Sequence, residues 1–136
     1  MSTDGAFQIA STDGLGPVMP PATNAIRQLR ISKRQRPDRA ILELDGELDL
    51  VSAPALEEAV LSVLRDGPAM VVLDLRAVSF IDSTGLKAVF SARSAVQERG
   101  RQFAVTQGSQ QVEHLLQLTR LNVHLHTLVA PDEALA

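Results

Sequence analysis

The segment Met70-Val71-Val72-Leu73-Asp74-Leu75 is an almost unbroken run of apolar side chains. Such a run is typical of a central strand covered on both faces, as in a parallel sheet with crossover helices. It therefore predicts an α/β protein rather than a one-sided antiparallel sheet. The chain has 136 residues, which is enough for one domain with a sizeable core, and it has no cysteine for disulfides.

The segments before this run have the pattern of a hairpin followed by a helix. Two apolar stretches, 26–31 and 40–44, flank Arg36-Pro37-Asp38-Arg39, whose composition is typical of a turn, and together they predict an antiparallel hairpin. The next helix is expected to begin after Ser52 as its N-cap. Its buried face is predicted from residues at helical spacing: Leu56, Ala59, Val60, Val63 and Leu64.

After the apolar run, helix and strand patterns alternate to the end of the chain. A helix is expected to begin near Ser83 or Thr84 and to end at Gly100, and a strand follows over 102–106. A third helix is capped by Ser109, and the last strand and a short terminal helix are expected over 122–128 and from 131. The order β-β-α-β-α-β-α-β-α predicts a mixed, mostly parallel sheet with helices packed against it and right-handed crossovers.

Residues 1–25 differ from the remainder in composition. They are rich in Ser, Thr, Gly and Pro and lack periodic apolar positions, which predicts a flexible extension ahead of a domain over 26–136. The chain shows neither a signal-peptide pattern nor an apolar run near the ~18 residues of a membrane span, so we expect a cytoplasmic protein without membrane contact. The basic cluster within 26–39 has no aromatic neighbour to stack on bases, and we interpret it as a solvated strand face rather than a nucleic-acid site.

The segment from Arg76 to Thr84 is the candidate functional region, because functional side chains gather where strands end and helices begin. We expect it to be a loop that carries an accessible Ser83 hydroxyl beside the free N–H groups of the following helix. Asp82 or Ser83 is also suited to cap that helix. A nucleophilic role for Ser83 is disfavoured, because the G-x-S-x-G elbow is absent and His114 has no identifiable orienting acid. A lone Gly85 does not make a phosphate-binding loop.

Two further groups resemble metal ligands. His124 and His126 share a face of the last predicted strand, but the sequence offers no third ligand. Asp45, Glu47 and Asp49 alternate, yet they lack the Gly and Glu of a calcium loop. Partly exposed strands explain both groups, so we predict neither a metal nor a cofactor.

At this point the chain resembles a known family, the STAS domain, and within it the anti-sigma factor antagonists of bacterial partner switching. The resemblance covers residues 26–136. It rests on the order and spacing of four segments, which are Leu44-Asp45-Gly46-Glu47-Leu48-Asp49, Val72-Leu73-Asp74-Leu75, Phe80-Ile81-Asp82-Ser83-Thr84-Gly85-Leu86 and Ala130-Pro131-Asp132-Glu133-Ala134-Leu135.

The resemblance implies a binding module in transcription regulation rather than an enzyme. In this family the serine after the aspartate of D-S-[ST]-G-L is phosphorylated by the anti-sigma factor, which is an ATP-dependent serine kinase. On this chain that serine is Ser83. The unphosphorylated antagonist binds the anti-sigma factor and frees a sigma factor, the phosphorylated form is released, and a PP2C-type phosphatase removes the phosphate.

The resemblance also implies a partner-binding set made of Asp82, Ser83, Thr84 and Gly85 together with Gly46, Glu47 and Asp49 of the neighbouring loop. A different function remains open, that of a non-switching structural STAS subunit in a stress-signalling assembly or a lipid transporter. The chain departs from many relatives at Arg120, where they carry glycine, so the third helix is expected to end without a left-handed glycine.

Overall fold

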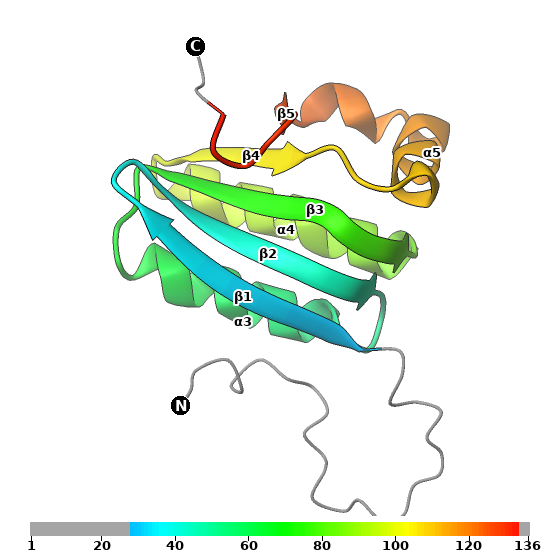
Figure 1. Cartoon of the computed structure of the whole chain (residues 1–136), viewed down its shortest axis with the longest axis horizontal. Coiled ribbons are helices and arrows are strands. Elements are labelled where there is room, and N and C mark those ends of the chain that lie inside the picture. The colour runs from blue at the N-terminus through cyan, green and yellow to red at the C-terminus, as the bar shows by residue number, and fades with distance from the viewer. Residues whose placement is uncertain (1–27, 134–136) are drawn as a thin grey trace, which may run out of the picture.

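The computed structural model describes residues 28–133. Its five strands form one sheet in the order β1-β2-β3-β4-β5 (Figure 1). β1 and β2 form an antiparallel hairpin, and every later neighbour pairs in parallel. The prediction of a mixed, mostly parallel sheet is confirmed. The strands are β1 Leu29–Arg36, β2 Arg39–Leu48, β3 Met70–Ile81, β4 Gln102–Thr106 and β5 Thr127–Leu128.

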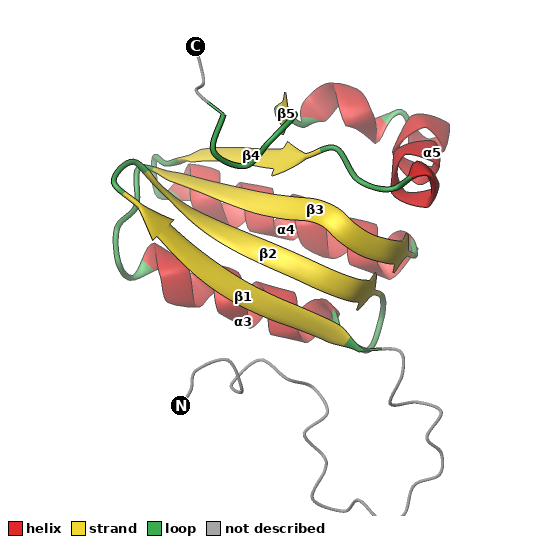
Figure 2. Ribbon diagram, in the orientation of Figure 1, coloured by secondary structure: helices red, strands yellow, loops and turns green. Residues whose placement is uncertain are grey.

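Two long helices cover one face of this sheet. In Figure 2, α3 (Ala53–Leu64) and α4 (Ser83–Glu98) both lie behind the strands. The third helix, α5 (Gln110–Thr119), lies near the end of β3 and is followed by the 3₁₀ helix η2 (Leu121–His124). α3 and α4 therefore cover one face of the sheet, and the opposite face also buries a small group of apolar side chains.

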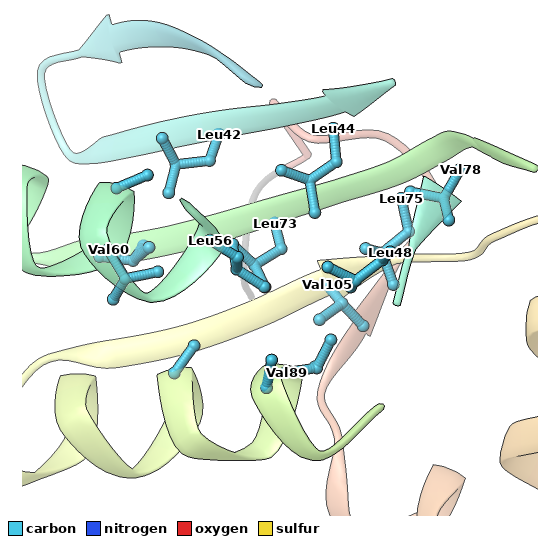
Figure 3. Packing of buried hydrophobic residues seen from close by; sticks show 14 of the residues in the cluster. Leu42, Leu44, Leu48, Leu56, Val60, Leu73, Leu75, Val78, Val89 and Val105 are labelled. Atoms are coloured by element: carbon cyan, nitrogen blue, oxygen red, sulfur yellow. The ribbon is translucent and has the colours of Figure 1, made fainter. Parts of the chain in front are cut away.

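The main core is aliphatic and lies between the sheet and the two covering helices. Leucines and valines of the strands face those of α3 and α4 (Figure 3). A smaller apolar cluster lies apart from it, formed by Ile41, Met70, Val72, Ala104 and Leu128. Because successive residues of a strand point to opposite faces, the centre of β3 contributes to both clusters, which explains its unbroken apolar run.

The prediction that the central strand ends at Leu75 is wrong, because β3 continues to Ile81 beside β2. Most of the expected loop from 76 to 84 is therefore strand. The register shifts between Glu43 and Asp45 and again between Gly46 and Glu47. Such bulges interrupt the alternation of buried and exposed residues, which is the strand signal that a sequence carries most directly.

The prediction of a strand over 122–128 is also wrong for its first half. Arg120 ends α5 in the left-handed conformation with φ 61°, and the chain then enters η2 before the two-residue strand β5. As predicted, α5 ends without a left-handed glycine, and Arg120 adopts the left-handed conformation in its place. The predicted terminal helix is not found in the described residues, which form turns up to Glu133. The proposed extension over 1–25 lies outside the described residues.

Basic side chains of the hairpin pair with carboxylates and carbonyls of the same chain. Arg39 is 4% exposed, and its Nη1 donates to the carbonyl oxygens of Pro131 (3.0 Å) and Glu133 (2.8 Å). Arg36 forms an ion pair with Asp132 at 2.9 Å. These contacts attach the last described residues to the hairpin end of the sheet, and buried Arg39 departs from the solvated strand face expected for the basic cluster.

A buried carboxylate on β3 gives the first testable prediction. Asp74 is 6% exposed and accepts hydrogen bonds from the Arg76 guanidinium (both 2.9 Å) and from Thr106 Oγ1 (3.1 Å). Burial raises the pKa of Asp74, but the hydrogen bonds from Arg76 and Thr106 outweigh it, so the pKa lies below its ordinary value. Asp74→Asn is expected to lower the free energy of unfolding at pH 7 by about 1–3 kcal/mol.

The pH dependence of this loss follows from the direction of the pKa shift. A carboxyl group with a lowered folded-state pKa stabilises the fold above its unfolded pKa of about 3.9, and the contribution disappears as the pH falls through the folded value. Urea unfolding of both proteins should therefore show a constant difference between about pH 5 and 8 that shrinks below about pH 4. The control is Asp66→Asn, which removes an exposed ion pair with Lys33 and should cost less than about 1 kcal/mol. A difference in unfolding free energy between wild type and Asp74→Asn that persists unchanged at pH 3 would contradict the lowered pKa of Asp74.

Candidate functional site

The N-terminus of α4 follows β3 with one residue between them, and that residue is its cap. Asp82 has an extended backbone, and its Oδ1 accepts a hydrogen bond from the backbone N–H of Gly85 at 2.8 Å. Of the two caps considered from the sequence, the structure has Asp82. Ser83 is the first residue of the helix and is exposed. Because Asp82 provides the capping oxygen, the hydroxyl of Ser83 is not needed to hold the helix end.

The start of α4 packs directly against the end of β2. The carbonyl oxygen of Leu48 accepts from the backbone N–H of Asp82 at 3.3 Å. Gly85 is buried against the same carbonyl, and a Cβ atom at Gly85 would lie only 2.1 Å from the Leu48 oxygen. Glycine at this position therefore allows a close approach of helix to strand. Thr84, beside it, is half-buried.

The loop between β2 and α3 is held by its own hydrogen bonds. Asp49 Oδ1 accepts from the backbone N–H groups of Val51 and Ser52, both at 3.1 Å. Ser52 Oγ donates to the carbonyl oxygen of Glu47 at 2.8 Å and accepts from the Asp49 N–H at 3.0 Å. Ser52 occupies the predicted N-cap position, but its side chain makes no capping bond to α3. It joins the two ends of the loop instead.

The last part of β2 is shaped by Gly46. Its φ of 127° favours glycine, and a Cβ there would lie 2.0 Å from the carbonyl oxygen of Gln28. The same oxygen accepts from the Glu47 N–H at 3.3 Å. Glu47 pairs with Phe80 on β3, so the loop residues lie beside the residues that lead into α4. The structure thus brings the two predicted segments, 46–49 and 82–85, to one end of the sheet.

One residue that positions this end was not found from the sequence. The side-chain amide of Gln111, on α5, accepts from the N–H of Ile81 at 2.9 Å and donates to the Ile81 carbonyl at 3.1 Å. It therefore takes the place of a neighbouring strand where β4 has already ended. Gln111 is exposed and distant in sequence from Ile81, so no local pattern signals this contact.

The arrangement around Ser83 does not resemble a nucleophilic site. Within residues 28–133, no hydrogen bond joins Ser83 Oγ to a histidine, lysine or carboxylate. His114 lies exposed on α5, and His124 lies in η2 rather than on the strand predicted to carry it and His126. In the same part of the chain no group of three or more His, Asp or Glu residues is arranged to hold a metal ion. Among the described residues, Ser83 therefore has no hydrogen-bonded base of the kind that activates a nucleophile.

Comparison with known proteins identifies several similar chains. The family model "STAS domain" matches residues 30–134. The anti-sigma-F factor antagonist RsfB of Mycobacterium tuberculosis is 37% identical over 86 residues, which are 63% of this chain and 64% of RsfB. The crystal structure of an anti-sigma factor antagonist from Mycobacterium paratuberculosis superposes with a TM-score of 0.69 at 28% identity, covering 76% of this chain and 88% of that one.

The same fold also occurs in a protein of a transporter family. A sulfate transporter family protein from Wolinella succinogenes aligns with a TM-score of 0.59 at 24% identity, over 79% of this chain and 82% of that chain. This likeness concerns the fold alone. In residues 28–133, none of the helices has the length and apolar character needed to cross a membrane.

Proposed function

Since the chain belongs to the STAS domain family, we propose that it is an anti-sigma factor antagonist controlled by phosphorylation of Ser83. The unphosphorylated protein binds an anti-sigma factor with ATP-dependent serine kinase activity and so frees a sigma factor. Phosphorylation ends that binding, a PP2C-type phosphatase restores it, and the antagonist itself catalyses nothing. The observation that carries the proposal is the exposed Ser83 at the first position of a helix that is capped by Asp82. RsfB, which is named an anti-sigma-F factor antagonist, supports the class of partner.

The position of Ser83 suits a switch that leaves the fold intact. A phosphate there adds about −2 charges beside the positive end of the α4 dipole, which favours an anion. The helix cap is provided by Asp82 Oδ1 and does not depend on the serine hydroxyl. Modification is therefore expected to change the surface while the stability of the domain changes little.

The partner surface is proposed to consist of Asp82, Ser83, Thr84 and Gly85 with Gly46, Glu47 and Asp49. The loop part is held by the Asp49 and Ser52 hydrogen bonds, and the helix part is packed on Leu48. A surface that is already ordered loses little conformational entropy when it binds. A negative charge added at Ser83 is then expected to lower the affinity directly.

Charge repulsion after phosphoryl transfer is proposed to release the antagonist from the kinase. To receive the γ-phosphoryl group of ATP, Ser83 Oγ must come within ~3–3.5 Å of the phosphorus in the docked complex. After transfer, the phosphoserine faces the remaining phosphates of the nucleotide and stands next to the Asp82 carboxylate. Like charges held together at a desolvated interface repel, so the product complex is weaker than the substrate complex.

Phosphorylation of Ser83 is tested directly by mass spectrometry. The protein is incubated with Mg-ATP and with each purified anti-sigma factor kinase of the source organism in turn. We expect one kinase to add one phosphate to the peptide that contains Ser83, because this hydroxyl is exposed while that of Thr84 is half-buried. Ser83→Ala should remain unlabelled, whereas Thr84→Ala should still be labelled on Ser83.

Two results would contradict the proposal. Labelling of Thr84 instead of Ser83 would contradict the assignment of the switch to Ser83. Absence of labelling with every kinase would favour a non-switching structural subunit of a stress-signalling assembly or a lipid transporter. In that case the same chain should co-purify with its assembly irrespective of ATP.

A further inference from the structure

Large apolar side chains are exposed at the same end of the sheet as Ser83. Leu50 is 67% exposed and Val51 is 70% exposed, and the two are consecutive in the loop that joins β2 to α3. Phe80, near the end of β3, is 38% exposed. Single exposed apolar residues are normal on a protein surface, but consecutive ones at the tip of a short loop are not, because loop tips are usually polar.

The apolar pair Leu50–Val51 is held outward by the loop itself. Asp49 Oδ1 binds the N–H of Val51 and that of Ser52, and Ser52 Oγ binds back to the Glu47 carbonyl. These bonds close the loop on its inner side, where Ser52 is 2% exposed. The apolar pair cannot turn into the core without breaking them. Its exposure is thus built into the fold.

The apolar pair also lies within the reach of any protein that covers Ser83. The loop leaves β2 at Leu48, and the Leu48 carbonyl is the group on which Asp82 and Gly85 are packed. A protein interface of standard size covers about 800 Å² on each partner. A kinase that docks on Ser83 over such an area covers the adjoining loop as well.

The loop that carries the apolar pair is acidic, although exposed Arg30 on β1 stands opposite Asp45 in the sheet. Residues 45–52 include Asp45, Glu47 and Asp49 and no lysine or arginine, and Asp82 lies across from them at the end of β3. An acidic rim around an apolar centre is complementary to an apolar recess bordered by basic side chains. We expect the partner to present such a recess to the loop. The nucleotide phosphates that face Ser83 in the proposed complex belong to a different part of the partner.

We infer that the apolar pair Leu50–Val51 inserts into a recess of the anti-sigma factor kinase that is aliphatic at its centre and bordered by lysine or arginine. The inference rests on the proposed function and extends it to the source of the affinity. Phosphorylation of Ser83 leaves the apolar pair unchanged. Binding strength therefore comes from one part of the partner surface and its control from another.

The test uses two matched substitutions on exposed leucines. Leu50→Asp places a charge at the centre of the proposed contact. Leu61→Asp makes the same change at a 44% exposed position on α3, about 12 Å along the helix from Ala53 at 1.5 Å per residue. Affinity for the purified kinase in Mg-ADP is measured by calorimetry, with circular dichroism as the check on folding. We expect a loss of about thirtyfold or more for Leu50→Asp and of less than about threefold for Leu61→Asp.

The outcomes separate the inference from the proposed function. If Leu50→Asp binds like the wild type while Ser83 is still phosphorylated, the inference is wrong and the proposed function stands. If no kinase of the source organism binds or labels the wild type, the proposed function falls and the inference with it. If the wild type self-associates in sedimentation and Leu50→Asp is monomeric, the apolar pair binds a second copy, which also overturns the inference. A Leu50→Ala variant that loses affinity by a smaller factor than Leu50→Asp would support it.

Discussion

Gly85→Ala is expected to lower the free energy of unfolding by about 3 kcal/mol, the upper end of the range for overpacked sites. A Cβ atom at this position would lie 2.1 Å from the Leu48 carbonyl oxygen and 2.7 Å from its carbon. Neither atom belongs to a flexible side chain, so the clash is relieved only by moving α4 away from β2. That movement would weaken the Asp82 N–H bond to the same carbonyl and disturb the packing of Leu86 below it.

The measurement is urea unfolding at neutral pH, with Gly100→Ala as the control. Gly100 has φ 73°, and among the described residues no neighbouring segment would come within 4 Å of a Cβ atom there, so alanine meets backbone strain and no clash. Its expected cost is about 1–2 kcal/mol, the usual penalty for an alanine in the left-handed region. Equal losses for the two variants would show that the contact between α4 and β2 is looser than its geometry implies.

Ser83→Asp is expected to weaken binding to the anti-sigma factor kinase by about a hundredfold, which corresponds to about 2.7 kcal/mol. The carboxylate introduces negative charge where the proposed complex brings together Asp82 and the phosphates of the nucleotide. Ser83→Ala removes only an exposed hydroxyl and should bind within about threefold of the wild type. Both affinities are measured by calorimetry in Mg-ADP with the kinase that labels Ser83.

A control for added charge is available on the same helix. Ser94 is exposed and lies eleven residues further along α4, so Ser94→Asp makes the same chemical change away from the partner surface. Its affinity should match that of the wild type. Equal affinities for Ser83→Ala and Ser83→Asp would rule out a switch at this residue, whatever the behaviour of Ser94→Asp.

The central features of the fold were predictable because they depend on local patterns. The apolar run at Met70–Leu75 specified a strand covered on both faces, and the structure places β3 there, in the middle of the sheet. Asp82 was one of two caps considered for α4, and its carboxylate makes the capping bond. Periodicity and capping act over a few residues, so a sequence displays them directly.

The features that were missed depend on contacts between distant segments or on rare backbone conformations. The extension of β3 to Ile81 requires the bulged pairing with β2, and the end of β3 is held by Gln111 from α5. Arg120 adopts a positive φ that is uncommon for a residue with a side chain, and this converts the expected strand into η2. No short window of sequence contains the partners of these interactions.

The candidate site was likewise predictable in part. The position of Ser83 at a helix start followed from turn and capping chemistry, and its exposure agrees with that placement. The adjoining loop entered the prediction only through resemblance to a family. Its hydrogen bonds between Asp49 and Ser52, and the outward position of the apolar pair Leu50–Val51, became visible only in three dimensions.

The contacts of Gln28 and Arg39 give the domain two ends that are not equivalent for protein engineering. The described chain enters the sheet at Gln28, whose carbonyl oxygen accepts from the Glu47 N–H beside the proposed partner surface. It leaves near Glu133, whose carbonyl is held by Arg39 at the hairpin turn, at the opposite end of β2. A fluorophore or affinity tag joined after residue 133 is therefore carried away from the docking region, whereas one joined just before Gln28 is delivered to it. A biosensor of the switch should therefore carry its reporter just before Gln28 and its surface tether after Glu133.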